Sequence, residues 1–84
     1  FHHLEVVLAE LDPGGSTGEE PYRHGDSEEV FVVLAGRVRL QLDGDTYELG
    51  RGDSVQYRSS TPHRVANHGS EPAEVMFVVS PPSY

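Results

Sequence analysis

Two histidines and one carboxylate stand where they could bind a metal ion together. His24 and His63 each follow a turn and lead into an apolar segment, and Glu29 lies in the first of these segments. Two imidazoles and one carboxylate on neighbouring strands form the ligand set that holds non-haem iron. Each histidine also suits an ordinary structural role at the start of a strand. The residue types alone leave both interpretations open.

The other three histidines have plainer explanations. His2 and His3 lie at the start of the chain, where we interpret them as solvated strand residues. His68 lies between Asn67 and Gly69, in a turn where a polar residue is ordinary. We therefore leave all three out of the candidate site.

The segment between the two candidate histidines contains a hairpin whose register follows from its residues. Asp43-Gly44 is a favoured two-residue turn, because both residues tolerate the positive φ of a type I′ turn. Folding about this turn gives one apolar face, and on the other face a hydrogen-bonding pair and an opposite-charge pair. The predicted pairs are Leu42 with Asp45, Leu40 with Tyr47, Val38 with Leu49, Gln41 with Thr46, and Arg39 with Glu48. A shift of one residue would destroy both patterns.

In the rest of the chain, turn-forming residues are spaced as in an all-β protein. Gly, Pro, Asp and Asn recur at short intervals, and the segments between them are rich in Val, Leu, Tyr and Phe. Residues 30–34 are apolar on both faces, which is typical of a central strand or of one covered by another subunit. Many short strands with regular turns predict a sandwich or barrel with no helix longer than a turn.

Length, cysteine content and charge limit the function. The 84 residues allow one small domain, which we place at 1–84, and the lack of cysteine excludes disulfides and a thiol nucleophile. Fourteen acidic residues against six arginines give a net charge of −8, so we expect no binding of nucleic acid by this domain alone. No apolar run approaches the roughly 18–20 residues of a membrane span, and we expect a cytoplasmic protein. Because the chain starts without Met inside an apparent strand, we expect it to be part of a longer protein.

Two stretches resemble the paired motifs of the cupin superfamily. In residues 18–36, four residues separate His24 from Glu29, and six more separate Glu29 from Gly36, as in the first motif. Residues 52–67 resemble the second motif, with His63 followed by an asparagine after three intervening residues. The resemblance covers nearly the whole chain. It implies an all-β, cupin-type double-stranded β-barrel (jelly roll).

The first motif departs from the family pattern at one ligand position. The family has a His-x-His pair, and Tyr22 occupies the place of its first histidine when His24 is aligned with the second. The alternative alignment, with Asp26 as the second member, leaves only two residues before Glu29. The resemblance thus implies a reduced metal set of His24, Glu29 and His63, which could hold one divalent ion (Fe, Zn, Ni or Mn) with water completing the shell. A pocket that binds an organic ligand without metal is the other possibility.

Tyrosines extend the candidate ligand site. Tyr57 shares a face with Val55, which favours a place in the core with its hydroxyl hydrogen-bonded, and the alternative is that it lines the ligand pocket. The candidate ligand-binding residues are Tyr22, His24, Glu29, Tyr57 and His63. No catalytic residue is assigned.

A closer resemblance is to the C-terminal cupin domain of small helix-turn-helix transcriptional regulators, and it is carried by residues 13–18, 28–36, 52–54 and 60–64. In that group a DNA-binding domain precedes a cupin that senses a small molecule. The resemblance therefore implies a small-molecule effector, and DNA contacts made through an N-terminal domain. The alternatives are a small metal-dependent enzyme of the dioxygenase, isomerase or decarboxylase type, or a storage or scaffold cupin with a vestigial site. The two-sided apolar segment at residues 30–34 also predicts a homodimer.

Overall fold

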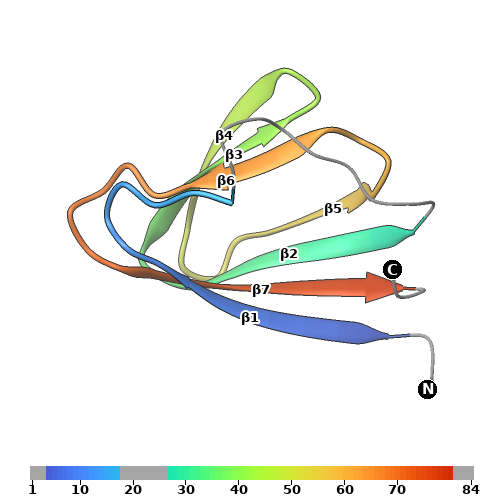
Figure 1. Cartoon of the computed structure of the whole chain (residues 1–84), viewed down its shortest axis with the longest axis horizontal. Coiled ribbons are helices and arrows are strands. Elements are labelled where there is room, and N and C mark those ends of the chain that lie inside the picture. Colours follow the sequence, from blue (N-terminus) through green and yellow to red (C-terminus); the bar gives the residue numbers. More distant parts are fainter. Residues whose placement is uncertain (1–3, 18–26, 81–84) are drawn as a thin grey trace.

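The computed structural model describes residues 4–17 and 27–80, which form two antiparallel β-sheets (Figure 1). The strands are β1 (Glu5–Leu11), β2 (Glu28–Ala35), β3 (Arg37–Leu42), β4 (Asp45–Gly50), β5 (Ser54–Arg58), β6 (His63–Ala66) and β7 (Ala73–Ser80). Sheet A has the strand order β1-β7-β2-β5, and sheet B has the order β4-β3-β6. The described part of the chain has no helix that could cross a membrane. The predicted all-β class is confirmed.

The chain passes repeatedly between the two sheets, which produces the jelly-roll connectivity. It leaves sheet A after β2, returns at β5, leaves again for β6 and returns at β7 (Figure 1). Strands far apart in sequence therefore become neighbours: β7 lies between β1 and β2, and β6 pairs with β3. The two sheets remain separate sheets that face each other across a common interior.

The hairpin of β3 and β4 has the predicted register at all five pairs. Asp43 has a φ of 50° and Gly44 a φ of 88°, as a type I′ turn requires. Val38 and Leu40 on the inner face are buried. The turn also contacts the residue before His63: the backbone N–H of Asp43 donates to the carbonyl of Pro62 at 2.9 Å.

The core fills the space between the sheets, and inward and outward residues alternate along each strand. Phe31 and Val33 of β2 are fully buried, and the ring of Phe31 lies 5.0 Å from that of Phe77 on β7. Further core residues are Leu11, Val38, Leu40, Leu49, Tyr57, Val65, Ala73 and Val75. The predicted central strand at residues 30–34 is β2, which lies between β7 and β5.

The outer side of sheet A is also apolar. Leu4, Val6 and Leu8 share a face, as their spacing indicates, but that face points away from the core and leaves them 57–68% exposed. Leu11, at the other parity, is the β1 residue that is buried. The apolar outer face continues over β7 and β2 through Met76, Val78, Val30, Val32 and Leu34.

Strand β6 is held on both sides, which fixes the element that carries His63. On one side it pairs with β3, and on the other the backbone N–H of Thr17 donates to the carbonyl of Val65 at 2.9 Å. Asn67 then closes the end of the strand: its Nδ2 donates to the carbonyls of Leu11 and Glu71, and its Oδ1 accepts from the N–H of Gly69. Asn67 therefore ties the end of β6 to the backbone of β1 and of the loop that leads to β7.

Candidate functional site

Three of the five predicted ligand-binding residues lie together on the inner side of the sheets. Glu29 of β2 is directly opposite Tyr57 of β5 in the antiparallel register. The ring of His63, from β6 of the other sheet, lies 4.9 Å from the ring of Tyr57. Tyr22 and His24 fall outside the described residues, so their roles stay predictions.

Glu29 and His63 form a buried pair of ionisable groups. Oε2 of Glu29 lies 3.7 Å from Nε2 of His63, and each side chain is only 2% exposed. This distance is too long for a direct hydrogen bond, and the contact is an ion pair only when the imidazole is protonated. Charges removed from water in this way cost several kcal/mol each unless a partner of opposite charge compensates them. The pair is therefore an energetically demanding feature of an otherwise apolar interior.

A hydrogen bond on the ring nitrogen that faces away from Glu29 fixes the orientation of the His63 ring. Nδ1 of His63 lies 2.8 Å from the backbone carbonyl of Thr61. A carbonyl oxygen can only accept, so Nδ1 carries a hydrogen and donates it. In the neutral imidazole, Nε2 then presents its lone pair on the side of Glu29. Histidines that bind metals are commonly oriented by a backbone carbonyl on their other nitrogen in this way.

The donor set suits a divalent metal but is incomplete within the described residues. A carboxylate oxygen and an imidazole nitrogen are ligands that Fe, Zn, Ni and Mn accept. Residues 4–17 and 27–80 contain no group of three His, Cys, Asp or Glu side chains that could hold a metal ion. Glu29 and His63 would supply two of the ligands that such a site needs. A third protein ligand would have to come from elsewhere in the chain, and the sequence motif assigns it to His24.

Ser59 is a polar residue near the end of β5 that the sequence reasoning missed. It is fully buried, and its Oγ has no hydrogen-bond partner among the described residues. Its backbone N–H donates to the carbonyl of Ser27 at 2.7 Å, which places it two residues beyond Tyr57 along the strand pair that contains Glu29. The signal in the sequence was its parity, because Ser59 follows Val55 and Tyr57 at intervals of two.

The sequence matches the profile of the cupin domain family over residues 7–79. The chain belongs to the cupin family. The resemblance of the two motifs is thereby confirmed, and the two-sheet jelly roll is the fold expected for a cupin.

The relatives of this cupin include both a regulator and an enzyme. It is 33% identical over 61 residues to the uncharacterized protein MJ1618 of Methanocaldococcus jannaschii, covering 73% of this chain and 49% of that protein. It is 27% identical over 81 residues to the HTH-type transcriptional regulator PuuR of Escherichia coli, covering 96% of this chain and 43% of PuuR. It is 36% identical over 67 residues to quercetin 2,3-dioxygenase of Bacillus subtilis, covering 77% of this chain and 19% of the dioxygenase. The chain thus spans about half or less of the length of these relatives.

Solved structures agree on the fold. The cupin domain of an XRE-family transcriptional regulator from Enterobacter cloacae superposes with a TM-score of 0.83 at 24% identity, covering 95% of this chain and 83% of that one. The protein BH2720 of Bacillus halodurans superposes with a TM-score of 0.89 at 22% identity, covering 99% and 66%. At these identities the likeness establishes the cupin fold.

Proposed function

We propose that this cupin is the small-molecule-sensing domain of a helix-turn-helix transcriptional regulator, with its effector bound between the two sheets. The observation that carries the proposal is the buried pair of Glu29 and His63, whose Oε2 and Nε2 face each other at 3.7 Å. Tyr57 adds a ring and a hydroxyl beside this pair. A cation or a hydrogen-bond donor between a carboxylate and an imidazole would stabilise both groups. The effector is therefore a small molecule with a cationic or donor group, or one bound through a metal ion.

A divalent metal would be held by Glu29 and His63 together with His24. When bound, it would supply positive charge and open positions for oxygen atoms of the effector. The contact of Nδ1 of His63 with Thr61 would keep Nε2 directed at the site with or without the metal. Tyr22, which occupies the place of a fourth ligand, would line the pocket as a hydrogen-bonding side chain.

A regulatory role is supported by the match to PuuR, which covers 96% of this chain. The net charge of −8 disfavours contact of this domain with phosphates, so DNA would be bound by a separate N-terminal domain in the cytoplasm. Sensing then requires that the effector bind one conformation of the protein more tightly than the other. A coding frame that places a helix-turn-helix pattern before residue 1 would support this role, and a frame without one would contradict it.

A homodimer is part of the proposal. The outer apolar face of sheet A, formed by Val6, Leu8, Val30, Val32, Leu34, Met76 and Val78, covers three adjacent strands. Monomers rarely leave a contiguous apolar patch of this kind open to water. We assign the face to a second copy of the chain, because its centre carries no charge and two copies of a −8 chain can meet there without opposing their carboxylates. A two-fold dimer of this type buries the same patch on both copies.

Metal loading tests the interior site. We expect the purified chain, incubated with Zn²⁺ and desalted, to retain one Zn²⁺ per chain by elemental analysis. Glu29→Gln and His63→Gln should each lower the affinity by about tenfold or more. Glu28→Gln is the matched control, because it removes the same charge from the exposed residue next to Glu29. Equal loss of affinity in the control, or no loss in the two site variants, would contradict this assignment of the metal ligands.

A small metal-dependent enzyme is the second candidate. It is favoured by the same buried carboxylate–imidazole pair, because an acid–base group beside a metal is what such enzymes use. The relative that is a dioxygenase adds support. Turnover by the metal-loaded chain that is lost in Glu29→Gln would favour the enzyme. Saturable binding of a small molecule without turnover would favour the sensor.

A further inference from the structure

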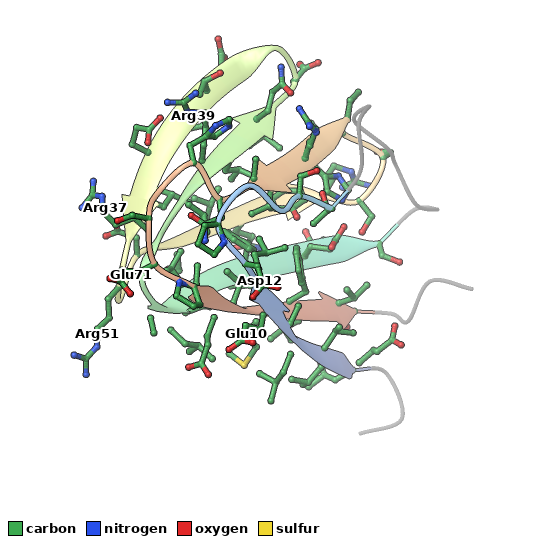
Figure 2. All side chains as sticks on the ribbon, turned by 60° about the vertical axis from the view of Figure 1, so that its left-hand side comes forward. Glu10, Asp12, Arg37, Arg39, Arg51 and Glu71 are labelled. Carbon is green, nitrogen blue, oxygen red and sulfur yellow. The ribbon has the colours of Figure 1, made fainter. Side chains whose placement is uncertain are left out.

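The outer face of sheet B gathers positive charge in an otherwise acidic chain. Arg37 and Arg39 project from β3 on the side opposite to the buried Val38 and Leu40, and Figure 2 shows both on one side of the molecule. Arg64 projects outward from β6, between the inward-facing His63 and Val65. Three of the six arginines of the chain therefore lie on this one face.

The register places two of these arginines around a small residue. Arg39 is opposite Ala66, and Arg64 is opposite Gln41, so Arg39 and Arg64 are diagonal neighbours across the β3–β6 pair. Diagonal neighbours of this kind lie about 7–8 Å apart, within reach of long side chains. Ala66 contributes only a methyl group between them, and the exposed His68 follows two residues later.

A depression lies over Ala66. We call this depression the arginine groove. It has a volume of about 290 Å³ and is lined by Arg39, Gln41, Thr46, Arg64, Ala66 and His68. A smaller depression of about 180 Å³ adjoins it, shares Arg39 and His68, and extends to Arg37. Among the described residues that line the two depressions, Glu48 is the one acidic side chain.

We propose that the arginine groove binds a small dianion, of the class of dicarboxylates and phosphate monoesters. The guanidinium group presents a planar fork of donors that matches carboxylate and phosphate oxygens in a bidentate manner. Two such forks, on Arg39 and Arg64, flank the groove, and Gln41 and Thr46 add neutral donors to its wall. The anion would fill the depression over Ala66.

The Arg39–Glu48 pair and the net charge of the chain are too weak to prevent this binding. Glu48 pairs with Arg39, but the two side chains are 55% and 45% exposed, and exposed pairs of this kind contribute about 1 kcal/mol or less. The net charge of −8 repels anions at long range. At physiological ionic strength, however, charges farther away than about 8 Å are largely screened, so the arginines inside the groove dominate.

The groove is a second site, distinct from the proposed effector site. His63 and Arg64 are adjacent in β6 and point to opposite sides of sheet B, so the sheet itself separates the interior from the groove. The inference therefore does not depend on the proposed function. A variant that disables the interior, Glu29→Gln, should keep the affinity of the groove unchanged.

Titration with inorganic phosphate, and separately with malonate, tests the groove by backbone amide NMR at constant ionic strength set with NaCl. We expect saturable shifts at residues of β3 and β6, and the tighter of the two probes identifies the class of anion. Arg39→Gln and Arg64→Gln should each weaken binding by about tenfold. Glu48→Gln should tighten it, because it removes the carboxylate that pairs with Arg39.

The matched control is Arg51→Gln, which makes the same change of charge in the turn after β4, outside the groove (Figure 2). We expect it to keep the affinity within about twofold of the original chain. Arg64 also lies 3.5 Å from Ser16 Oγ, so if Arg64→Gln unfolds the chain, Arg39→Gln and Glu48→Gln decide the question. Shifts that rise linearly without saturation, or an equal loss in Arg51→Gln, would overturn the proposal.

Discussion

Oε2 of Glu29 and Nε2 of His63 face each other at 3.7 Å across the interior of the jelly roll, one carried by sheet A and the other by sheet B. The residues are 34 positions apart in the sequence, and the hairpin of β3 and β4 lies between them. Both side chains are 2% exposed, and their polar atoms are adjacent. A group that offsets the cost of burying one of them therefore also interacts with the other. The pair therefore affects both the stability of the fold and the proposed binding of the effector.

Removing one member of this pair should destabilise the chain more than removing both. His63→Leu leaves the Glu29 carboxylate buried without its imidazole, which we expect to cost about 3 kcal/mol of unfolding free energy. The double variant Glu29→Leu/His63→Leu replaces both groups by apolar side chains of similar volume. It should be more stable than the single variant His63→Leu. Urea denaturation of the two single variants and the double variant measures the coupling. Additive losses would mean that the two groups do not interact.

Asn67 should be as important for stability as a large core residue. Its side chain is 1% exposed and makes three hydrogen bonds to the backbone, to Leu11, Glu71 and Gly69. Asn67→Ala leaves the buried carbonyl of Leu11 unsatisfied and removes the two part-buried bonds to Glu71 and Gly69, and we expect a loss of about 3 kcal/mol. Thermal unfolding of Asn67→Ala measures it against His68→Ala, which changes the exposed next residue and should stay within about 0.5 kcal/mol of the original chain. A loss as small as that of His68→Ala would show that Asn67 does not hold the loop.

The parts of the fold that local chemistry determines are the parts that the sequence predicted in detail. The hairpin register followed from the positive φ of Asp43-Gly44 and from alternation along β3 and β4, which are both local properties. Alternation also puts Val6 and Leu8 on one face, because they are two residues apart. It could not say which face meets the core, because that depends on where β1 joins sheet A, and the structure turns these residues outward.

The candidate site illustrates the same limit. No local pattern relates Glu29 to His63, since their proximity arises only when sheet A and sheet B pack face to face. The resemblance to the paired cupin motifs was what predicted that the two residues belong to one site. The clustering of Arg39 and Arg64 was missed because it depends on the β3–β6 register, which no turn between those strands specifies.

Two glycines at positive φ should respond differently to alanine. Gly36 has a φ of 79°, and a Cβ there would lie 2.7 Å from the carbonyl oxygen of Pro72 and 2.9 Å from the Cα of Ala73. Gly44 has a φ of 88° and nothing within 4 Å of the same position. Gly44→Ala therefore meets only backbone strain, of about 1 kcal/mol. Gly36→Ala adds a clash with backbone and should cost clearly more in urea denaturation, and equal losses would contradict the close approach at Gly36.

The outer apolar face of sheet A should control the oligomeric state. Light scattering coupled to size exclusion should give the mass of two chains at micromolar concentration. Leu8→Lys places a charge on a side chain that is 68% exposed in the single chain, so it should leave the fold intact and shift the mass to that of one chain. Ser70→Lys adds the same charge in an exposed loop between β6 and β7 and should remain dimeric. A single-chain mass for the unchanged protein, or a dimer that survives Leu8→Lys, would assign this face to something other than a second copy.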